Sequence, residues 1–211
     1  MKVIGIGDNV CDKYIHLKTM FPGGQALNFS VYAKQLGADA SYMGVFGTDQ
    51  EAAHVIRTLD ELGIEHGRCR QYEGENGCAR VTLEDGDRIF LGSNKGGIAK
   101  ERPLQLDEED LKYISGFSHV HTSNNSHFDS QLALVKSTGV SLSYDFFRTV
   151  EGGREGCRCG ALCGLCVPFL WLCLGGGGQG CLPEDEKSGM QKNHSYQGEA
   201  MEPFIMTGSS F

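Results

Sequence analysis

The sequence predicts an α/β fold: a doubly wound parallel sheet in three layers, with a small β-hairpin lid. Three observations predict it. Short apolar segments typical of buried strands alternate with segments whose apolar residues recur at helical spacing. A ribbon-like segment with a polar turn interrupts this alternation between residues 77 and 92. The alternation stops near Phe147, so residues 1–147 are expected to form the folded part of the chain.

The first strand and the first helix lie on either side of a glycine turn. Lys2–Ile6 is a short apolar strand. Asp8 and Asn9 follow at its carboxyl end, the edge at which open α/β sheets bind ligands. His16–Phe21 is expected to be an extended segment that leads into the glycine turn. Apolar residues at helical spacing then predict a helix over Ala26–Leu36, which a glycine ends.

The remaining elements continue the alternation. The pattern predicts a strand, an amphipathic helix, a strand that begins at Ile64, a hairpin, a helix, a strand, a helix and a last strand. Apart from the strand at Ile64, the expected ranges are Ala40–Val45, Gln50–Leu62, Gly77–Gly92, Pro103–Ile114, His119–Thr122, Phe128–Ser137 and Val140–Phe146. Strands that alternate with helices in this way favour a parallel sheet with helices on both faces.

Charge and hydropathy exclude several classes of protein. The 211 residues have a formal net charge of −8, and the pI is near 5.3. This balance argues against nucleic acid or an anionic membrane surface as a partner. The longest apolar stretch, Ala161–Leu174, is too short for a membrane span and is interrupted by Gly164 and Pro168. Because no cationic start precedes an apolar run, no signal peptide is expected, and we expect a cytoplasmic protein.

The segment of residues 22–49 gives the strongest indication of a binding site. Gly23 and Gly24 remove two side chains where the backbone must pass close to another group. Asn28 follows on the first turn of the predicted helix. Its amide can both donate hydrogen bonds to hydroxyl groups and accept hydrogen bonds from them.

This segment resembles the first signature of the ribokinase-like sugar kinases, the PfkB family. The resemblance is carried by the two glycines, then Asn28, the small residue Ser30, Gly37 and Gly47. It covers residues 1 to about 147 and implies a ribokinase-like, Rossmann-like three-layer fold.

A narrower resemblance points to the fructoselysine 6-kinase branch of this family. It is carried by Gly5–Asn9, by Asp12–Tyr14 and by Asp87–Phe90. In sugar kinases of the family, a ribbon such as the hairpin of residues 77–92 forms a lid over the sugar. Sequence alone does not distinguish such a lid from an ordinary edge hairpin.

The resemblance implies ATP-dependent phosphorylation of a hydroxyl group on a sugar or a fructoselysine-like sugar derivative. ATP and Mg²⁺ are the cofactors expected for a full-length family member. The expected partner is a small-molecule sugar, and a homodimer formed through the lid is a further possibility. The implied substrate-binding residues are Asp8, Asn9, Asp12, Gly23, Gly24, Gln25 and Asn28. Carboxylates and amides suit this role because each can hold neighbouring hydroxyls with paired hydrogen bonds. The simpler alternatives are a solvated loop charge for Asp12 and a helix cap for Asn28.

No catalytic residue is assigned. In the family, the base and the donors for the transferring phosphoryl group come from a late Gly-Ala-Gly-Asp motif at a helix N-terminus. This motif does not occur in the 211-residue sequence. The chain is therefore expected to be a truncated and inactive version of such a kinase. The alternatives are a non-catalytic sugar-binding protein and, more weakly, a cysteine-rich metal-binding module.

The composition changes abruptly after residue 147. Six of the nine cysteines lie between Cys157 and Cys181, and Gly175–Gly178 are four consecutive glycines. In shifted reading frames, the codons of this region permit segments that resemble the next strand and helix of the family, and a later hairpin. We interpret residues 148–211 as an out-of-frame tail that is disordered or poorly folded.

Two residue patterns in the sequence could indicate a metal site, but neither fits one well. The cysteines from Cys157 to Cys166 match no standard zinc spacing, and a disulfide framework is unusual in a cytoplasmic chain. His119 and His121 share one face of a predicted strand, but no third ligand is evident. We therefore expect no metal, and we interpret the two histidines as partly buried strand residues or ligand contacts.

Overall fold

The computed structural model describes residues 1–145, 165–167 and 209–210. One sheet contains β1 (Lys2–Gly7), β4 (Asp39–Phe46), β5 (Arg70–Gln71), β8 (His119–Ser123), β9 (Ser141–Asp145) and β10 (Leu165–Val167). A second sheet contains β2 (Val10–Tyr14), β3 (Thr19–Gly23), β6 (Cys78–Glu84), β7 (Asp87–Ser93) and β11 (Ser209–Ser210). The helices are α1 (Gln25–Gln35), α2 (Gln50–Glu61), α3 (Ile98–Glu101), α4 (Glu108–Ile114) and α5 (Leu132–Ser137), with 3₁₀ turns η1 (Asn124–Ser126) and η2 (Asp129–Gln131).

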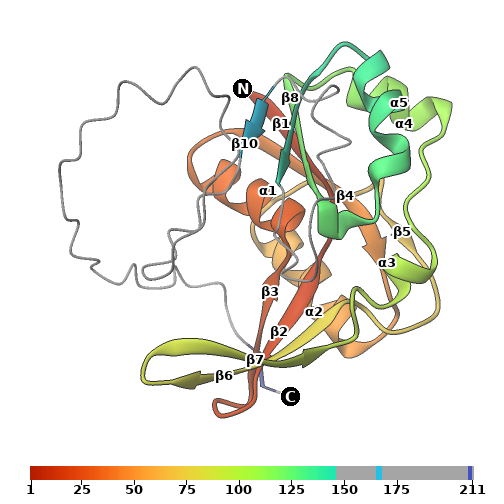
Figure 1. The fold of residues 1–211 in the computed structure, drawn as a ribbon. Helices are drawn as coiled ribbons and strands as arrows, with labels where there is room; N and C mark the ends of the chain where they lie inside the picture. The colour runs from red at the N-terminus through yellow and green to blue at the C-terminus, as the bar shows by residue number, and fades with distance from the viewer. Residues whose placement is uncertain (146–164, 168–208, 211) are drawn as a thin grey trace, which may run out of the picture. The chain divides into compact units, whose positions relative to one another are not determined.

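The first sheet has the strand order β10-β9-β8-β1-β4-β5, and its pairings are parallel. The second sheet, the lid sheet, has the order β11-β3-β2-β6-β7. In the lid sheet, β2 pairs antiparallel with β3 and parallel with β6, and β6 and β7 form an antiparallel hairpin. The prediction of a doubly wound parallel sheet with a β-hairpin lid is confirmed for the described residues (Figure 1).

Helices cover both faces of the parallel sheet, which gives the three layers seen in Figure 1. On one face, α1 and α2 bury Leu27, Val31 and Leu59. On the other face, α4 and α5 bury Ile114 and Val135. Each face therefore has its own apolar core, as expected for strands whose alternate side chains point to opposite sides.

Gly5 allows α1 to lie directly on the central strand β1. A Cβ atom at this position would lie 2.1 Å from the carbonyl oxygen of Ala26 and 2.6 Å from Oγ of Ser30. The N–H of Gly5 donates a hydrogen bond to Ser30 Oγ at 3.1 Å, and this hydroxyl donates to the carbonyl of Ser41 at 2.8 Å. The close contact fixes the depth of α1, and with it the position of its N-terminus at the carboxyl edge of the sheet.

Several short elements were not expected from the sequence: β2, α3, η1, η2, β10 and β11. β2 contains the charged residues Asp12 and Lys13, which interrupt an apolar strand pattern, and α3 has four residues, too few to show a helical period. The segment expected to be extended, His16–Phe21, instead contains part of a turn at residues 15–18 and the first residues of β3. Antiparallel pairing of β2 with β3 explains this turn, because two antiparallel neighbours need a tight connection.

Three predicted boundaries were wrong. The helix expected over Phe128–Ser137 begins at Leu132 as α5, after the 3₁₀ turn η2. The strand expected to begin at Ile64 is β5 at Arg70–Gln71, preceded by a single parallel bridge between Ser41 and Glu65. The helix expected over Pro103–Ile114 begins at Glu108 as α4. Its start is set by a capping box, in which the carboxylates of Asp107 and Asp110 each accept a hydrogen bond from the other's backbone N–H, at 2.8 and 3.1 Å.

Most of the segment 148–211 lies outside the described residues, and so does most of its cysteine pattern; β10 and β11 are its described parts. The interpretation of this segment as an out-of-frame tail remains a prediction. Within the described part of the chain, no helix combines the length and the apolar character that a membrane crossing requires.

Replacing Gly5 with alanine should lower the free energy of unfolding by about 3 kcal/mol, because the new methyl group overlaps the backbone carbonyl of α1. Urea unfolding followed by circular dichroism measures this change. Gly67→Ala is the control, because its methyl group would meet only the flexible end of Glu65 at 3.0 Å. Equal midpoints for both variants would show that α1 does not lie against β1 as described.

Candidate functional site

The chain changes direction in the sheet between β1 and β8. From β1, the chain continues to β4 and β5 on one side, whereas β8 and β9 lie on the other side. At such a switch point, the carboxyl ends of neighbouring strands form the crevice in which open α/β sheets bind ligands. Asp8 follows β1, Ser123 ends β8 and Asp145 ends β9, so these three side chains belong to this edge.

The carboxylate of Asp8 holds the N-terminus of α1. Its Oδ2 accepts a hydrogen bond from the N–H of Gln25 at 2.7 Å, and its Oδ1 accepts one from the N–H of Ala26 at 3.2 Å. The hydroxyls of Ser123 and Ser126 each donate to Oδ1 at 2.9 Å. Asp8 thus caps α1 from a distant part of the sequence, where a negative charge also complements the helix dipole.

The two glycines of the turn permit a close approach of backbone to backbone. Gly24 is the N-cap of α1 and has φ 110. A Cβ there would lie 2.7 Å from the carbonyl oxygen of Asp8 and 2.8 Å from Cα of Asn9. A Cβ at Gly23 would lie 3.2 Å from Oδ2 of Asp12. The glycine turn therefore lies against the segment that connects β1 to β2.

Asn28 lies at the end of the first turn of α1. Its N–H donates to the carbonyl of Gly24 at 2.8 Å, so Asn28 is within the helix and not at its cap. The helix-cap interpretation of Asn28 is therefore wrong, because Gly24 occupies the cap position and Asp8 supplies the capping oxygens. The Oδ1 atom of Asn28 is buried and has no hydrogen-bond partner among the described residues. Its capacity to accept a hydrogen bond is therefore not used by any described residue.

Asp12 lies on β2 and forms an ion pair with Arg88 of β7, with 2.6 Å between Oδ2 and Nη2. The side chain of Asp12 is 18% exposed, so it is not the solvated loop charge that was one interpretation of the sequence. Burial raises the pKa of the Asp12 carboxyl above its ordinary value, and the charge of Arg88 opposes this rise. The sequence identified Asp12 as a site residue but not Arg88.

Asn9 is part of the protein interior, with 2% of its surface exposed. Its Nδ2 donates to the hydroxyl of Tyr42 at 3.1 Å and to the carbonyl of Val45 at 2.9 Å. Its Oδ1 accepts from Nδ2 of Asn76 at 2.8 Å. These bonds join the end of β1 to β4 and to the loop before β6.

Gln25 connects α1 to the ends of β8 and β9. Its Nε2 donates to Oδ2 of Asp145 at 2.5 Å, and its Oε1 accepts from Nδ2 of Asn125 at 3.1 Å. Burial raises the pKa of Asp145, the hydrogen bond from Gln25 opposes the rise, and the charge of Asp8 adds to it. Oδ1 of Asp145 is buried without a hydrogen-bond partner in the part of the chain that the structure describes. An aspartate at the carboxyl end of a parallel strand is the signal in the sequence that marks this residue.

His119 and His121 are bound to serine hydroxyls. Nε2 of His119 and Nδ1 of His121 each lie 2.7 Å from Oγ of Ser143. Burial lowers the pKa of His121 to about 4, and the charge of His119 adds to the shift. The interpretation of the pair as partly buried strand residues is confirmed. Residues 1–145 contain no cluster of three or more histidine, cysteine, aspartate or glutamate residues arranged for a metal ion.

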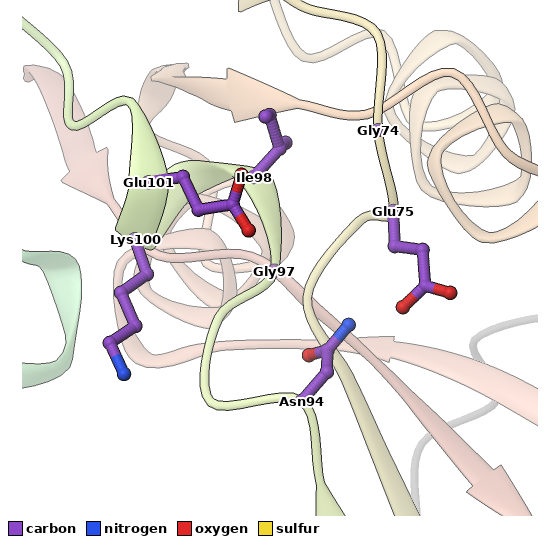
Figure 2. A pocket seen from close by; sticks show the side chains of 7 residues that line it. All are labelled: Gly74, Glu75, Asn94, Gly97, Ile98, Lys100 and Glu101. Atoms are coloured by element: carbon purple, nitrogen blue, oxygen red, sulfur yellow. The ribbon is translucent and has the colours of Figure 1, made fainter.

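A hollow of about 460 Å³ lies beside α3, apart from the residues described above (Figure 2). Its walls are Gly74, Glu75, Asn94, Gly97, Ile98, Lys100 and Glu101. Figure 2 shows Glu75 and Glu101 on different walls, one from the loop before β6 and one from α3. None of the site residues predicted from the sequence lines this hollow. The switch point is therefore the better candidate, because Oδ1 of Asp145 at the end of β9 is buried without a described partner, whereas no residue that lines the hollow has such an atom.

Solved sugar kinases are among the structures that share this fold. Ribokinase from Arabidopsis thaliana, complexed with ribose and ATP, superposes with a TM-score of 0.58 at 20% identity, over 68% of this chain and 52% of that chain. Fructokinase from Xylella fastidiosa with bound ATP gives 0.55 at 16% identity, over 76% and 53%. The chain also matches the family model of the pfkB family carbohydrate kinases over residues 7–145. It belongs to that family.

Two curated relatives are similar in sequence. Fructosamine kinase FrlD from Bacillus subtilis (strain 168) is 46% identical over 147 residues, which are 69% of this chain and 51% of that protein. Fructoselysine 6-kinase from Escherichia coli (strain K12) is 27% identical over 141 residues, which are 67% and 53% of the two chains. The chain thus spans about half the length of the curated relatives it matches.

Replacing Asp8 with asparagine should lower the free energy of unfolding by about 2–3 kcal/mol. The amide has one acceptor oxygen in place of two, and its NH₂ group would face N–H or hydroxyl donors that now bond to Asp8. Chemical unfolding of the chain measures the loss. The exposed residue Asp39 provides the matched control, and Asp39→Asn should change the stability by less than about 0.5 kcal/mol. A stable Asp8→Asn protein would contradict the capping role.

Proposed function

We propose that the described residues form the sugar-binding part of an ATP-dependent carbohydrate kinase whose substrate is a fructosamine, a fructose that carries an amine-linked group. The observation that carries this proposal is the buried, unpartnered Oδ1 of Asn28 beside the glycine turn. Leaving such an oxygen without a donor is costly, so the site suits a ligand rich in hydroxyl groups. The names of the two curated relatives, fructosamine kinase and fructoselysine 6-kinase, support the substrate class.

The proposed roles of the site residues follow from their partners. Asn28 binds a sugar hydroxyl through its Oδ1, which has no described partner, and Asp12 does so through its Oδ1, because the described bond of Asp12 to Arg88 uses Oδ2. Gly23 and Gly24 keep the space beside that turn free of side chains. The three other residues that the sequence predicted as ligands position the turn, because their polar groups already bond to protein; they are Asp8, Asn9 and Gln25.

The described residues do not fit ATP or Mg²⁺, although both belong to the proposed activity. A helix N-terminus can bind phosphate through its N–H groups, but Asp8 already occupies the N–H groups of Gln25 and Ala26. An acidic cluster for a cation is also missing from residues 1–145. We therefore assign no nucleotide contact and no phosphoryl-transfer step to these residues.

The 211-residue polypeptide should show no sugar-dependent ATP turnover. Phosphoryl transfer needs a base for the attacking hydroxyl and donors for the phosphoryl oxygens, and the family motif that supplies them does not occur in the printed sequence. A coupled assay with fructoselysine, fructose and ribose tests this, with Bacillus subtilis FrlD as the positive control. Turnover above background that requires the sugar would show that the printed chain contains the catalytic groups.

A non-catalytic sugar-binding protein is the second candidate, favoured by the same missing motif. The two candidates differ in the coding DNA. A Gly-Ala-Gly-Asp sequence in a shifted frame downstream of the codon for Asp145 supports the kinase and the out-of-frame tail, and its absence supports the binding protein.

The proposal includes a homodimer formed through the lid. Ile89 and Leu91 of β7 are 38% and 50% exposed, and both are apolar. Exposed apolar side chains on an edge hairpin suit contact with a second copy of the chain.

Asn28→Ala should weaken fructosamine binding about tenfold, which corresponds to about 1–2 kcal/mol for one lost hydrogen bond to a neutral hydroxyl. The melting temperature should stay unchanged or rise, because alanine favours helix and the variant removes a buried unpartnered oxygen. Calorimetric titration with fructoselysine and thermal unfolding on the same sample measure both. Unchanged affinity with a lower melting temperature would mean that Asn28 has a structural role only.

A further inference from the structure

Arg88 reaches across the lid sheet to Asp12. β6 lies between β2, which carries Asp12, and β7, which carries Arg88. The two side chains are 76 residues apart in sequence, and Nη2 donates to Oδ2 at 2.6 Å. The ion pair therefore lies on one face of the lid sheet and spans the strand between them.

Aromatic rings hold the guanidinium in place. Its central carbon lies 5.6 Å from the ring centroid of Tyr14 and 5.1 Å from that of Phe90. Tyr14 is held edge-on by Phe21, with 5.5 Å between the ring centroids and 87° between the ring planes. Cation–π contacts of this kind favour one position of the charge. The arginine is therefore oriented before any ligand arrives.

This oriented cation still has donors to offer. The Arg88 side chain is 43% exposed, and one hydrogen bond, to Asp12, is described for it. A guanidinium presents a planar fan of N–H donors that matches the two oxygens of a carboxylate. An arginine placed in this way is suited to bind a carboxylate in two-point fashion, which a lysine cannot reproduce.

The pair also adjoins the proposed sugar site. A Cβ atom at Gly23 would lie 3.2 Å from Oδ2 of Asp12. The next residue, Gly24, is the N-cap of α1. A substituent on a sugar bound at the turn would therefore meet Asp12 first and Arg88 beyond it. Asp12 can face a sugar hydroxyl or a protonated amine, and Arg88 can face a negative group.

We infer that Arg88 binds the carboxylate of an amino acid attached to the sugar, and so selects sugar–amino acid conjugates over plain hexoses. The inference rests on the proposed function, because it requires the sugar to lie beside the glycine turn. A fructosamine made from an amino acid carries a protonated secondary amine and a carboxylate, and the Asp12–Arg88 pair offers one group of opposite charge for each. A plain hexose has neither charge.

Calorimetric titration of the 211-residue chain with two matched ligands tests the inference. Fructosyl-glycine carries the carboxylate, and fructosyl-glycinamide has nearly the same shape without the charge. The wild-type chain should bind the first about tenfold more tightly. Arg88→Gln should remove this preference, and Arg88→Lys should restore part of it. Arg80→Gln, at an exposed arginine of the neighbouring strand β6, should leave the preference intact.

Other outcomes would overturn the inference in distinguishable ways. Equal affinity of the wild-type chain for both ligands would show that no carboxylate is recognised, while leaving the sugar site in place. If Arg88→Gln weakened both ligands equally and lowered the melting temperature, Arg88 would only fasten β7 to β2. If neither conjugate nor fructose bound, the proposed function itself would fail, and the inference with it.

Raising the salt concentration should reduce the preference for the carboxylate, because the site is partly exposed.

Discussion

The capping of α1 by the carboxylate of Asp8 is the interaction on which the site depends. Two backbone N–H groups of α1 and the hydroxyls of Ser123 and Ser126 all donate to this one group. Asp8 therefore ties the end of β1 to the first turn of α1 and to the segment that follows β8. Gly5 sets the depth of the helix, Gly24 allows its N-terminus to approach β1, and Asn28 takes its position from both.

This cap also decides which ligand chemistry the edge of the sheet favours. A free helix N-terminus would attract phosphate, but here a protein carboxylate already satisfies it. Among the described polar atoms that are buried without partners, Oδ1 of Asn28 and Oδ1 of Asp145 are acceptors, from α1 and from the end of β9. Acceptor oxygens suit hydroxyl donors and not anions. The fixed positive charge of Arg88 lies farther out on the lid, where it would face a substituent and not the sugar ring.

The sequence allowed much of the fold to be predicted, because strands and helices of ordinary length show their period. β2 was missed because two charged residues interrupt its apolar pattern, and α3 was missed because four residues show no helical period. The start of α4 was misplaced because its cap lies at Asp107. The glycine turn and Asn28 were recognisable from local sequence and family resemblance. The partners of Asp8 and Asp12 were not, since the Asp12–Arg88 contact joins residues 76 positions apart. Such contacts depend on strand order and register, which local patterns do not encode.

The most direct test is a crystal structure of the chain with a fructosyl amino acid bound. The sugar should lie at the carboxyl edge of β1, with one of its hydroxyls about 3 Å from Oδ1 of Asn28 and the amino-acid part toward the lid. A sugar bound in the hollow between Glu75 and Glu101 (Figure 2), with Oδ1 of Asn28 still without a partner, would contradict the placement of the site.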